Sequence, residues 1–216
     1  MFIHDNIQAA IFDLDGTLID SMWVWNKIDM DYLKEKGHEV PHNFKNEISH
    51  LSFLQTAEYV KNRFDISDPI EKILDDWHKM AFNFYANKVK LKEGVIQFLD
   101  MLKSKNIKIA LATSNSIPLL EACLKNNGIY DYFDSITITD EVSRGKNFPD
   151  VYLLAAKKLN VSPENCIVFE DIIPAVKGAK AANMIVIAVR DESSIDDKDE
   201  LTKLSDKYIN SYLELI

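Results

Sequence analysis

Residues 9–21, AAIFDLDGTLIDS, decide the fold of this chain. Apolar residues 9–12 run directly into Asp13 and Asp15, so a segment typical of a buried strand ends in two carboxylates. Side chains alternate along an extended strand, so both carboxylates point to the same side, and Gly16 permits a sharp change of direction without a Cβ penalty. In open parallel sheets, ligands bind at the carboxyl ends of the strands. The stretch therefore predicts a ligand site at the end of the first strand.

Five short apolar runs have the pattern of fully buried strands. They are residues 9–12, 107–112, 136–139, 166–169 and 184–189. Helical patterns lie between the later runs, over residues 95–102, 150–159 and 174–182. Strands and helices in alternation predict an α/β fold, in which a mostly parallel sheet is covered by helices on both faces.

One long segment interrupts this alternation. From about Ser21 to Lys88 there is no strand-like run, only helical patterning rich in aromatic and charged residues. The segment is far too long for an ordinary loop between a strand and a helix. We interpret it as an inserted all-helical domain, residues 20–88, within a core formed by residues 1–19 and 89–216. The tract 191–200 is acidic and is predicted to be a solvated loop before a terminal helix.

The composition excludes several classes of partner. The 216 residues are 47% hydrophobic, enough for a sizeable core, and carry a net charge of −9. Nucleic acids and membrane surfaces need basic patches, whereas a bound cation can still bring a phosphorylated ligand to an acidic chain. No apolar run approaches the roughly 18 residues that span a bilayer, and the first residues lack a signal-peptide pattern. We expect a cytoplasmic protein, a monomer or weak dimer, that binds a small molecule.

Polar side chains follow two further strands of the predicted sheet. The run 107–112 ends in Thr113-Ser114-Asn115, and the run 166–169 ends in Glu170-Asp171. With the two aspartates of the first strand, this places four carboxylates in one crevice, where they would repel strongly unless a cation joined them. Hard oxygen ligands with an open substrate side suit Mg²⁺. A nearby hydroxyl, amide and lysine would suit the oxygens of a phosphate.

Each of these features has a plainer explanation when it is taken alone. Spaced acids and a glycine also begin an EF-hand loop, but here the glycine comes too early and the twelfth position, Val24, is not acidic. A solvated loop would explain residues 170–171, and turn or capping roles would explain residues 113–114. Lys146 alone would be a surface lysine. Their order and their placement at strand ends favour a shared site.

Four ordered segments resemble the motifs of the haloacid dehalogenase superfamily. They are FDLDGTLIDS (12–21), ALATSNS (110–116), GKNFPDVYLLAA (145–156), and VFED (168–171) followed by AVKGAKAANM (175–184). The resemblance is closest to the β-phosphoglucomutase-like phosphatases, which carry a helical cap inserted after the first motif. It implies a Rossmann-like core, a cap at the helical insert, and a Mg²⁺-dependent phosphatase that hydrolyses a small phosphate monoester through an aspartyl-phosphate intermediate.

Position by position, the resemblance makes Asp13 the nucleophile that accepts the phosphoryl group. It makes Asp15 the general acid that protonates the leaving alcohol, and then the base that activates water. These roles are chemically reasonable, because a carboxylate attacks a dianion only when a metal and a lysine neutralise the repulsion. Asp15 must be protonated to donate, so its pKa has to exceed that of Asp13.

The same resemblance distributes the remaining polar residues between phosphate and metal. Thr113 and the backbone amide of Ser114 would hold the phosphoryl oxygens, with Asn115 as a further substrate-binding candidate. Lys146 would pair with both the nucleophile and those oxygens. The implied Mg²⁺ ligands are Asp13, the main-chain carbonyl of Asp15, Glu170 and Asp171.

The fourth motif departs from the family pattern at three positions. Ile172 stands where a serine is usual, Ala175 where a glycine is usual, and Asn183 where a later glycine is common. Ile172 removes a possible hydrogen bond to the metal-binding carboxylates. The effect of this change on metal affinity is left open by the sequence.

The insert departs from the pattern of the mutases. Trp25 stands where the mutases and many sugar phosphatases carry histidine, and the arginine that grips a second phosphate has no clear match near residues 51–53. Both changes favour simple hydrolysis over a phosphomutase. Trp25 and Trp23 are candidates to line the substrate pocket, although Trp25 shares a helical stripe with Ile28 that packing in the insert's own core would explain.

Two further alternatives come from other classes of function. A haloacid dehalogenase is disfavoured, because Asp15 supplies an acid that displacement at carbon does not need. A binding or regulatory protein built on a catalytically silent core stays open because of Ile172.

Overall fold

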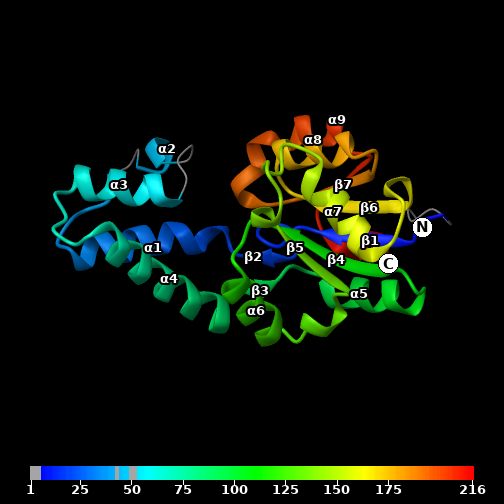
Figure 1. The fold of residues 1–216 in the computed structure, drawn as a ribbon, viewed down its shortest axis with the longest axis horizontal. Helices are drawn as coiled ribbons and strands as arrows, with labels where there is room; N and C mark the ends of the chain where they lie inside the picture. Colours follow the sequence, from blue (N-terminus) through cyan, green and yellow to red (C-terminus); the bar gives the residue numbers. More distant parts are fainter. Residues whose placement is uncertain (1–5, 42–43, 49–52) are drawn as a thin grey trace. The chain divides into compact units, whose positions relative to one another are not determined.

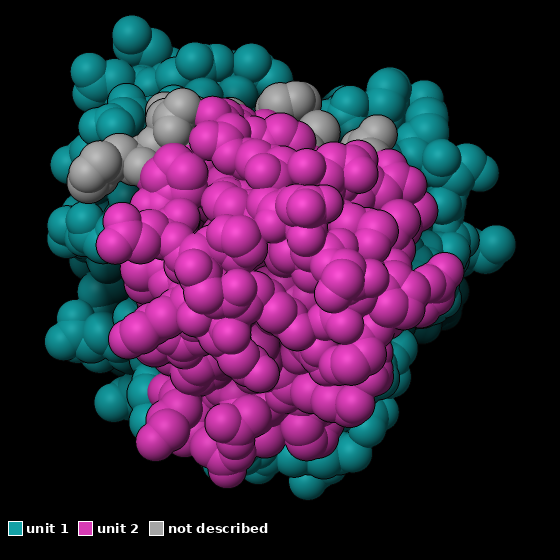
Figure 2. All heavy atoms as spheres, turned by 90° about the vertical axis from the view of Figure 1, so that its left-hand side faces the viewer, with its two compact units in different colours: residues 1–21, 89–216 teal, residues 22–88 magenta. Residues whose placement is uncertain are grey.

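The computed structural model of the chain describes residues 6–41, 44–48 and 53–216 (Figure 1). The chain divides into two compact units, one formed by residues 1–21 and 89–216 and the other by residues 22–88. Figure 2 distinguishes these two units by colour. We describe each unit separately, as the α/β unit and the helical unit.

The α/β unit contains a six-stranded sheet with the order β5-β4-β1-β6-β7-β8, and all of its neighbouring strands are parallel. Its strands are β1 (Ala9–Phe12), β4 (Lys108–Thr113), β5 (Ser135–Ile138), β6 (Cys166–Glu170), β7 (Ile185–Val189) and β8 (Lys207–Ile209). The predicted parallel α/β sheet is confirmed. The first strand is central, and its Phe12 pairs with Leu111 on one side and Phe169 on the other.

The end of the chain differs from the sequence-based expectation. The loop predicted over residues 191–200 is wrong, because the 3-10 helix η4 (Glu192–Asp197) and helix α9 (Lys198–Leu204) occupy this tract. Its acidic residues are compatible with helix, since Asp199 and Glu200 lie in the first turn of α9, where negative charge is favourable. Strand β8 was also missed, because three residues that begin with a lysine carry no apolar run.

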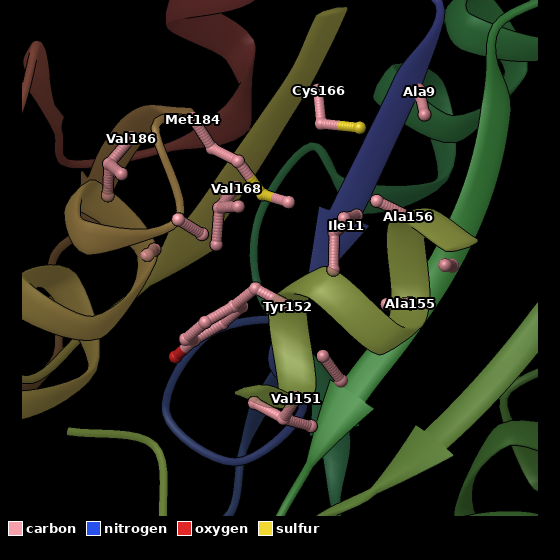
Figure 3. Packing of buried hydrophobic residues seen from close by; sticks show 14 of the residues in the cluster. Ala9, Ile11, Val151, Tyr152, Ala155, Ala156, Cys166, Val168, Met184 and Val186 are labelled. Carbon is pink, nitrogen blue, oxygen red and sulfur yellow. The ribbon is translucent and has the colours of Figure 1, made fainter. Parts of the chain in front are cut away.

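Helices cover the two faces of the sheet with different kinds of core. The helices of the α/β unit are α5 (Val95–Ser104), α6 (Ile117–Asn126), α7 (Asp150–Leu159), α8 (Ile173–Ala181) and α9. Small and branched residues such as Ala9, Ile11 and Val168 pack against α7 and α8 (Figure 3). The alternate residues of β1 and β6 enter an aromatic cluster on the other face, where Phe12 stacks on Phe169 with ring centroids 4.5 Å apart.

This alternation also decides where the strand-end acids lie. Ile11 faces α7, so the next residue of the same parity, Asp13, continues toward that face. Val168 and Glu170 follow the same rule on β6. The 3-10 helix η5 (Tyr212–Leu215) supports the opposite face, where Tyr212 packs against Phe98 of α5.

The helical unit follows directly from the first motif. Its elements are α1 (Met22–Glu35), α2 (Phe44–Ile48), α3 (Phe53–Arg63) and α4 (Ile70–Asn87). The chain leaves and returns to the α/β unit through the short antiparallel strands β2 (Ile19–Asp20) and β3 (Lys90–Leu91). No helix in the described ranges is both long and apolar enough to cross a membrane.

The predicted stripe on α1 is buried only in part. The residues that α1 buries are Val24, Ile28, Tyr32 and Leu33, and the Tyr32 ring meets Trp77 of α4 edge-on with centroids 5.7 Å apart. Trp25 is half-buried, whereas Trp23 is 37% exposed and contacts Phe84 of the same unit. The buried stripe of α1 is therefore rotated toward Val24.

Candidate active site

Three buried acids meet at the carboxyl ends of β1 and β6. Asp13, Glu170 and Asp171 each offer one carboxylate oxygen, and these oxygens lie within 4.8 Å of one another. The parallel pairing of β1 with β6 brings the acids together, and the Asp13 amide continues it by donating to the Phe169 carbonyl at 3.0 Å. The acidic cluster therefore lies at the edge of the sheet where the adjacent strands β1 and β6 end.

Lys146 lies inside this cluster. Its ammonium donates to Asp13 Oδ1 and, at 2.6 Å, to Glu170 Oε1. Burial lowers the pKa of Lys146, but the attraction of these two carboxylates outweighs burial and raises the pKa above its ordinary value. The lysine therefore stays charged. Its loop packs closely on α8, where a Cβ at Gly178 would lie 2.0 Å from the Lys146 carbonyl oxygen.

One lysine does not balance three buried acids. Burial raises the pKa of Glu170 to about 7 and raises the pKa of Asp171 well above its usual range. Glu170 Oε2 is buried and has no hydrogen-bond partner among the described residues. A buried, unpartnered carboxylate oxygen beside two other acids is the donor set that a divalent cation requires. The residues present therefore fit Mg²⁺, which Asp13, Glu170 and Asp171 would hold.

The loop after β1 shapes the site around Asp171. Thr17 Oγ1 donates to Asp171 Oδ1 at 3.1 Å, and the hydroxyl and carboxylate are both buried. Gly16 has a φ of +82°, and a Cβ on it would lie 2.2 Å from Asp171 Oδ2. The glycine is thus required twice, for its left-handed backbone and for the closeness of the carboxylate.

Gly16→Ala should therefore cost more stability than the same change at a comparable glycine. Gly128 has a φ of +70° and no described atom within 4 Å of a built Cβ. Gly128→Ala should therefore lower the free energy of unfolding by about 1 kcal/mol, the cost of a left-handed backbone at alanine. In Gly16→Ala the free energy of unfolding should fall by a further amount of about 1–3 kcal/mol, because the new methyl group would collide with the Asp171 carboxylate. Urea unfolding of both variants in chelator measures the difference. Equal losses would contradict the proposed contact with Asp171.

Asp15 accepts hydrogen bonds from two neutral side chains. Its Oδ1 accepts a hydrogen bond from Ser21 Oγ at 2.6 Å, and its Oδ2 accepts one from Asn115 Nδ2 at 2.7 Å. The Asn115 amide is itself oriented, because its Oδ1 accepts from the Ser116 backbone at 2.8 Å. Asn115, predicted to contact substrate, is thus placed on the carboxylate predicted to be the general acid.

The end of β4 supplies the remaining polar groups of this edge. Thr113 is buried and its hydroxyl accepts a hydrogen bond from the Asn115 backbone at 3.0 Å, while Ser114 is exposed. Asn115 therefore connects this strand end to Asp15. Trp23 and Trp25, the two predicted pocket residues, belong to the helical unit.

The three positions that depart from the family pattern have different surroundings in the structure. Ile172 is 39% exposed, and Asp171 has its hydrogen bond from Thr17. Asn183 adopts a φ of +60°, a left-handed conformation that asparagine tolerates better than most residues, so it can replace glycine there. Ala175 is fully buried within α8.

Sequence reasoning missed one buried polar partner of the cluster. The hydroxyl of Tyr152 on α7 donates to Glu170 Oε1 at 2.8 Å. In the sequence, Tyr152 lies among the apolar residues of α7 and has the pattern of a core residue. Only the packing of α7 on the sheet brings its hydroxyl to Glu170.

Comparison with known proteins agrees with this architecture. The model of a family described as haloacid dehalogenase-like hydrolase matches residues 10–189. A phosphorylated carbohydrates phosphatase of Thermotoga maritima is 31% identical over 180 residues, which cover 82% of each chain. A bifunctional riboflavin kinase/FMN phosphatase of Arabidopsis thaliana is 30% identical over 209 residues, 96% of this chain, which spans about half (54%) of that relative.

A solved structure is also similar. The β-phosphoglucomutase of Clostridium difficile superposes with a TM-score of 0.75 at 25% identity, covering 97% of this chain and 93% of that one. The fold and its relatives define the class as phosphoric monoester hydrolase. The chain belongs to the haloacid dehalogenase-like hydrolase family.

Proposed function

We propose that the protein is a Mg²⁺-dependent phosphatase that hydrolyses a small phosphate monoester through a phosphorylated Asp13. The observation that carries the proposal is the buried ammonium of Lys146, which bridges Asp13 and Glu170 beside an unpartnered carboxylate oxygen. A charged lysine against the attacking carboxylate reduces its repulsion from an anionic phosphate. The names of the relatives, a phosphorylated carbohydrates phosphatase and an FMN phosphatase, support the class of substrate.

The proposed reaction has two steps. A carboxylate oxygen of Asp13 attacks phosphorus, the ester P–O bond breaks, and protonated Asp15 gives its proton to the departing alkoxide. In the second step Asp15 takes a proton from water, whose oxygen attacks phosphorus and releases inorganic phosphate from Asp13. Mg²⁺, when bound, would supply further neutralisation of the phosphoryl charge.

Hydrogen bonds support the division of labour between the two aspartates. Asp13 faces the ammonium of Lys146, whereas Asp15 accepts hydrogen bonds from Ser21 and Asn115, which are neutral donors. We propose that Thr113, Ser114 and Lys146 bind the phosphoryl oxygens, and that the Asp15 carbonyl completes the metal ligands.

We further propose that residues 20–88 act as a cap that selects the substrate and excludes water during transfer. The two connections of this segment are paired side by side, Ile19 with Leu91, only a few residues after Asp15. Trp23 and Trp25 are the proposed pocket residues. Leu51 and Ser52, where the mutase arginine has no match, lie outside the described residues.

A phosphate-release screen tests the proposal. Hexose, pentose and alditol phosphates and flavin mononucleotide are supplied with Mg²⁺, and each reaction is repeated with excess chelator. We expect inorganic phosphate from at least one substrate, and loss of release in chelator. An isomeric sugar phosphate without inorganic phosphate would instead identify a phosphomutase, the class named for the similar structure from Clostridium difficile. Binding of Mg²⁺ and phosphate without any turnover would identify a binding protein.

A further inference from the structure

We propose that Tyr152 is a positioning residue that selects which oxygen of Glu170 is offered to the metal. Its hydroxyl and the Lys146 ammonium together occupy Oε1, and Oε2 is thereby left for the cation. The inference rests on the proposed function, because it concerns the Mg²⁺ site of that reaction.

The contact between Tyr152 and Glu170 is direct and buried. The hydroxyl donates to Oε1 at 2.8 Å, and both residues are fully buried. The ring projects from α7 within the apolar cluster between this helix and the sheet (Figure 3). Packing on this scale restricts the ring to one orientation, so its hydroxyl approaches the carboxylate from one direction.

The two carboxylate oxygens of Glu170 differ in their hydrogen-bond partners. Oε1 accepts from Lys146 at 2.6 Å as well as from Tyr152, so both of its lone pairs are used. Oε2 is buried and accepts nothing from the described residues. A native buried carboxylate oxygen without a partner requires an explanation, and a cation provides one.

Lys146 alone would not determine which of the two Glu170 carboxylate oxygens stays available to a cation. An ammonium is a compact charge on a flexible chain, and it is attracted to either oxygen of a carboxylate. The tyrosine hydroxyl forms a directional bond from a fixed ring and therefore sets the rotation of the carboxylate. Ile172, the residue after Asp171, has no polar group that could do so, which leaves Tyr152 as the orienting donor from α7.

The test is a Mg²⁺ titration of the metal-free protein by calorimetry, without substrate. Tyr152→Phe removes only the hydroxyl, and we expect its dissociation constant for Mg²⁺ to rise about tenfold, the range seen when groups that orient metal ligands are removed. In phosphate release, saturating Mg²⁺ should return kcat close to the wild-type value with an unchanged substrate KM. A merely structural role would lower stability without moving the Mg²⁺ constant.

Tyr32→Phe is the matched control. Tyr32 is also buried, and its hydroxyl has no partner among the described residues of either unit, so its loss should leave Mg²⁺ affinity unchanged. Should Tyr152→Phe not fold, 4-aminophenylalanine at position 152 keeps the ring and a donor. We expect this variant to bind Mg²⁺ within about twofold of wild type.

The outcomes separate the two proposals. A wild-type protein that binds no Mg²⁺ would overturn the metal site of the proposed function itself. A wild-type protein that binds Mg²⁺, with Tyr152→Phe binding equally well, would overturn the role of Tyr152 alone. A 4-aminophenylalanine variant that binds Mg²⁺ much more weakly than wild type would overturn it as well.

Discussion

Asp13→Asn should reduce phosphate release by about 10³-fold or more while the protein stays folded. The amide has nearly the volume of the carboxylate, but its oxygen is a poor nucleophile and cannot form the phosphoryl ester. The variant retains the Lys146–Glu170 ion pair, so the site should keep its architecture. The measurement is kcat with a substrate from the release screen at saturating Mg²⁺, together with a thermal melt that shows a cooperative transition.

Asp191→Asn provides a control with closely matched surroundings. Asp191 is exposed to the same extent as Asp13, 6%, and pairs with a lysine of its own, since Lys92 Nζ lies 2.9 Å from its Oδ2. It follows β7 rather than β1, outside the acidic cluster. This variant should lose stability yet keep kcat within a few-fold of wild type. An active Asp13→Asn protein, or an equally inactive control, would contradict the assignment of Asp13 as nucleophile.

The parts of the site that follow from strand periodicity could be foreseen from the sequence. A parallel sheet places all carboxyl strand ends on one edge, so residues after two apolar runs were expected to be neighbours. Asp13, Glu170 and Asp171 are neighbours for this reason, since β1 and β6 pair in register. Lys146 lies in a loop, and its position was inferred from the resemblance of its motif rather than from any spacing.

Contacts that depend on tertiary packing could not be foreseen. Tyr152 reaches Glu170 only because α7 lies across the sheet, and a tyrosine on an apolar helix face usually indicates core packing alone. The bond between Asn115 and Asp15 joins residues from β4 and β1 loops whose side-chain directions no local pattern determines. Strand β8 was missed for a related reason, because its pairing with β7 rather than its own sequence makes it a strand.

Lys146→Met should remove activity and leave Mg²⁺ binding intact. The lysine is 10% exposed and neutralises both Asp13 and Glu170, so breaking this buried pair should lower the free energy of unfolding by roughly 3–5 kcal/mol in chelator. Without the ammonium that pairs with Asp13 and Glu170, the cluster becomes more negative, and its affinity for Mg²⁺ should rise rather than fall. Addition of Mg²⁺ should therefore restore more stability to the variant than to wild type.

Activity should nevertheless stay at least about 10²-fold below wild type at saturating Mg²⁺, because the ammonium that shields Asp13 from the incoming phosphate is absent. Lys92→Met breaks an ion pair of similar burial whose carboxylate, Asp191, lies outside the cluster, so it should lose stability without this loss of activity. Lys92 attracts Asp171 less strongly than Lys146 does, so the gain in Mg²⁺ response should be smaller than in Lys146→Met. Urea unfolding with and without Mg²⁺ and kcat for both variants measure these effects. If Mg²⁺ restored the activity of Lys146→Met along with its stability, the lysine would serve only to balance charge in the folded state, and its role in phosphoryl transfer would be disproved.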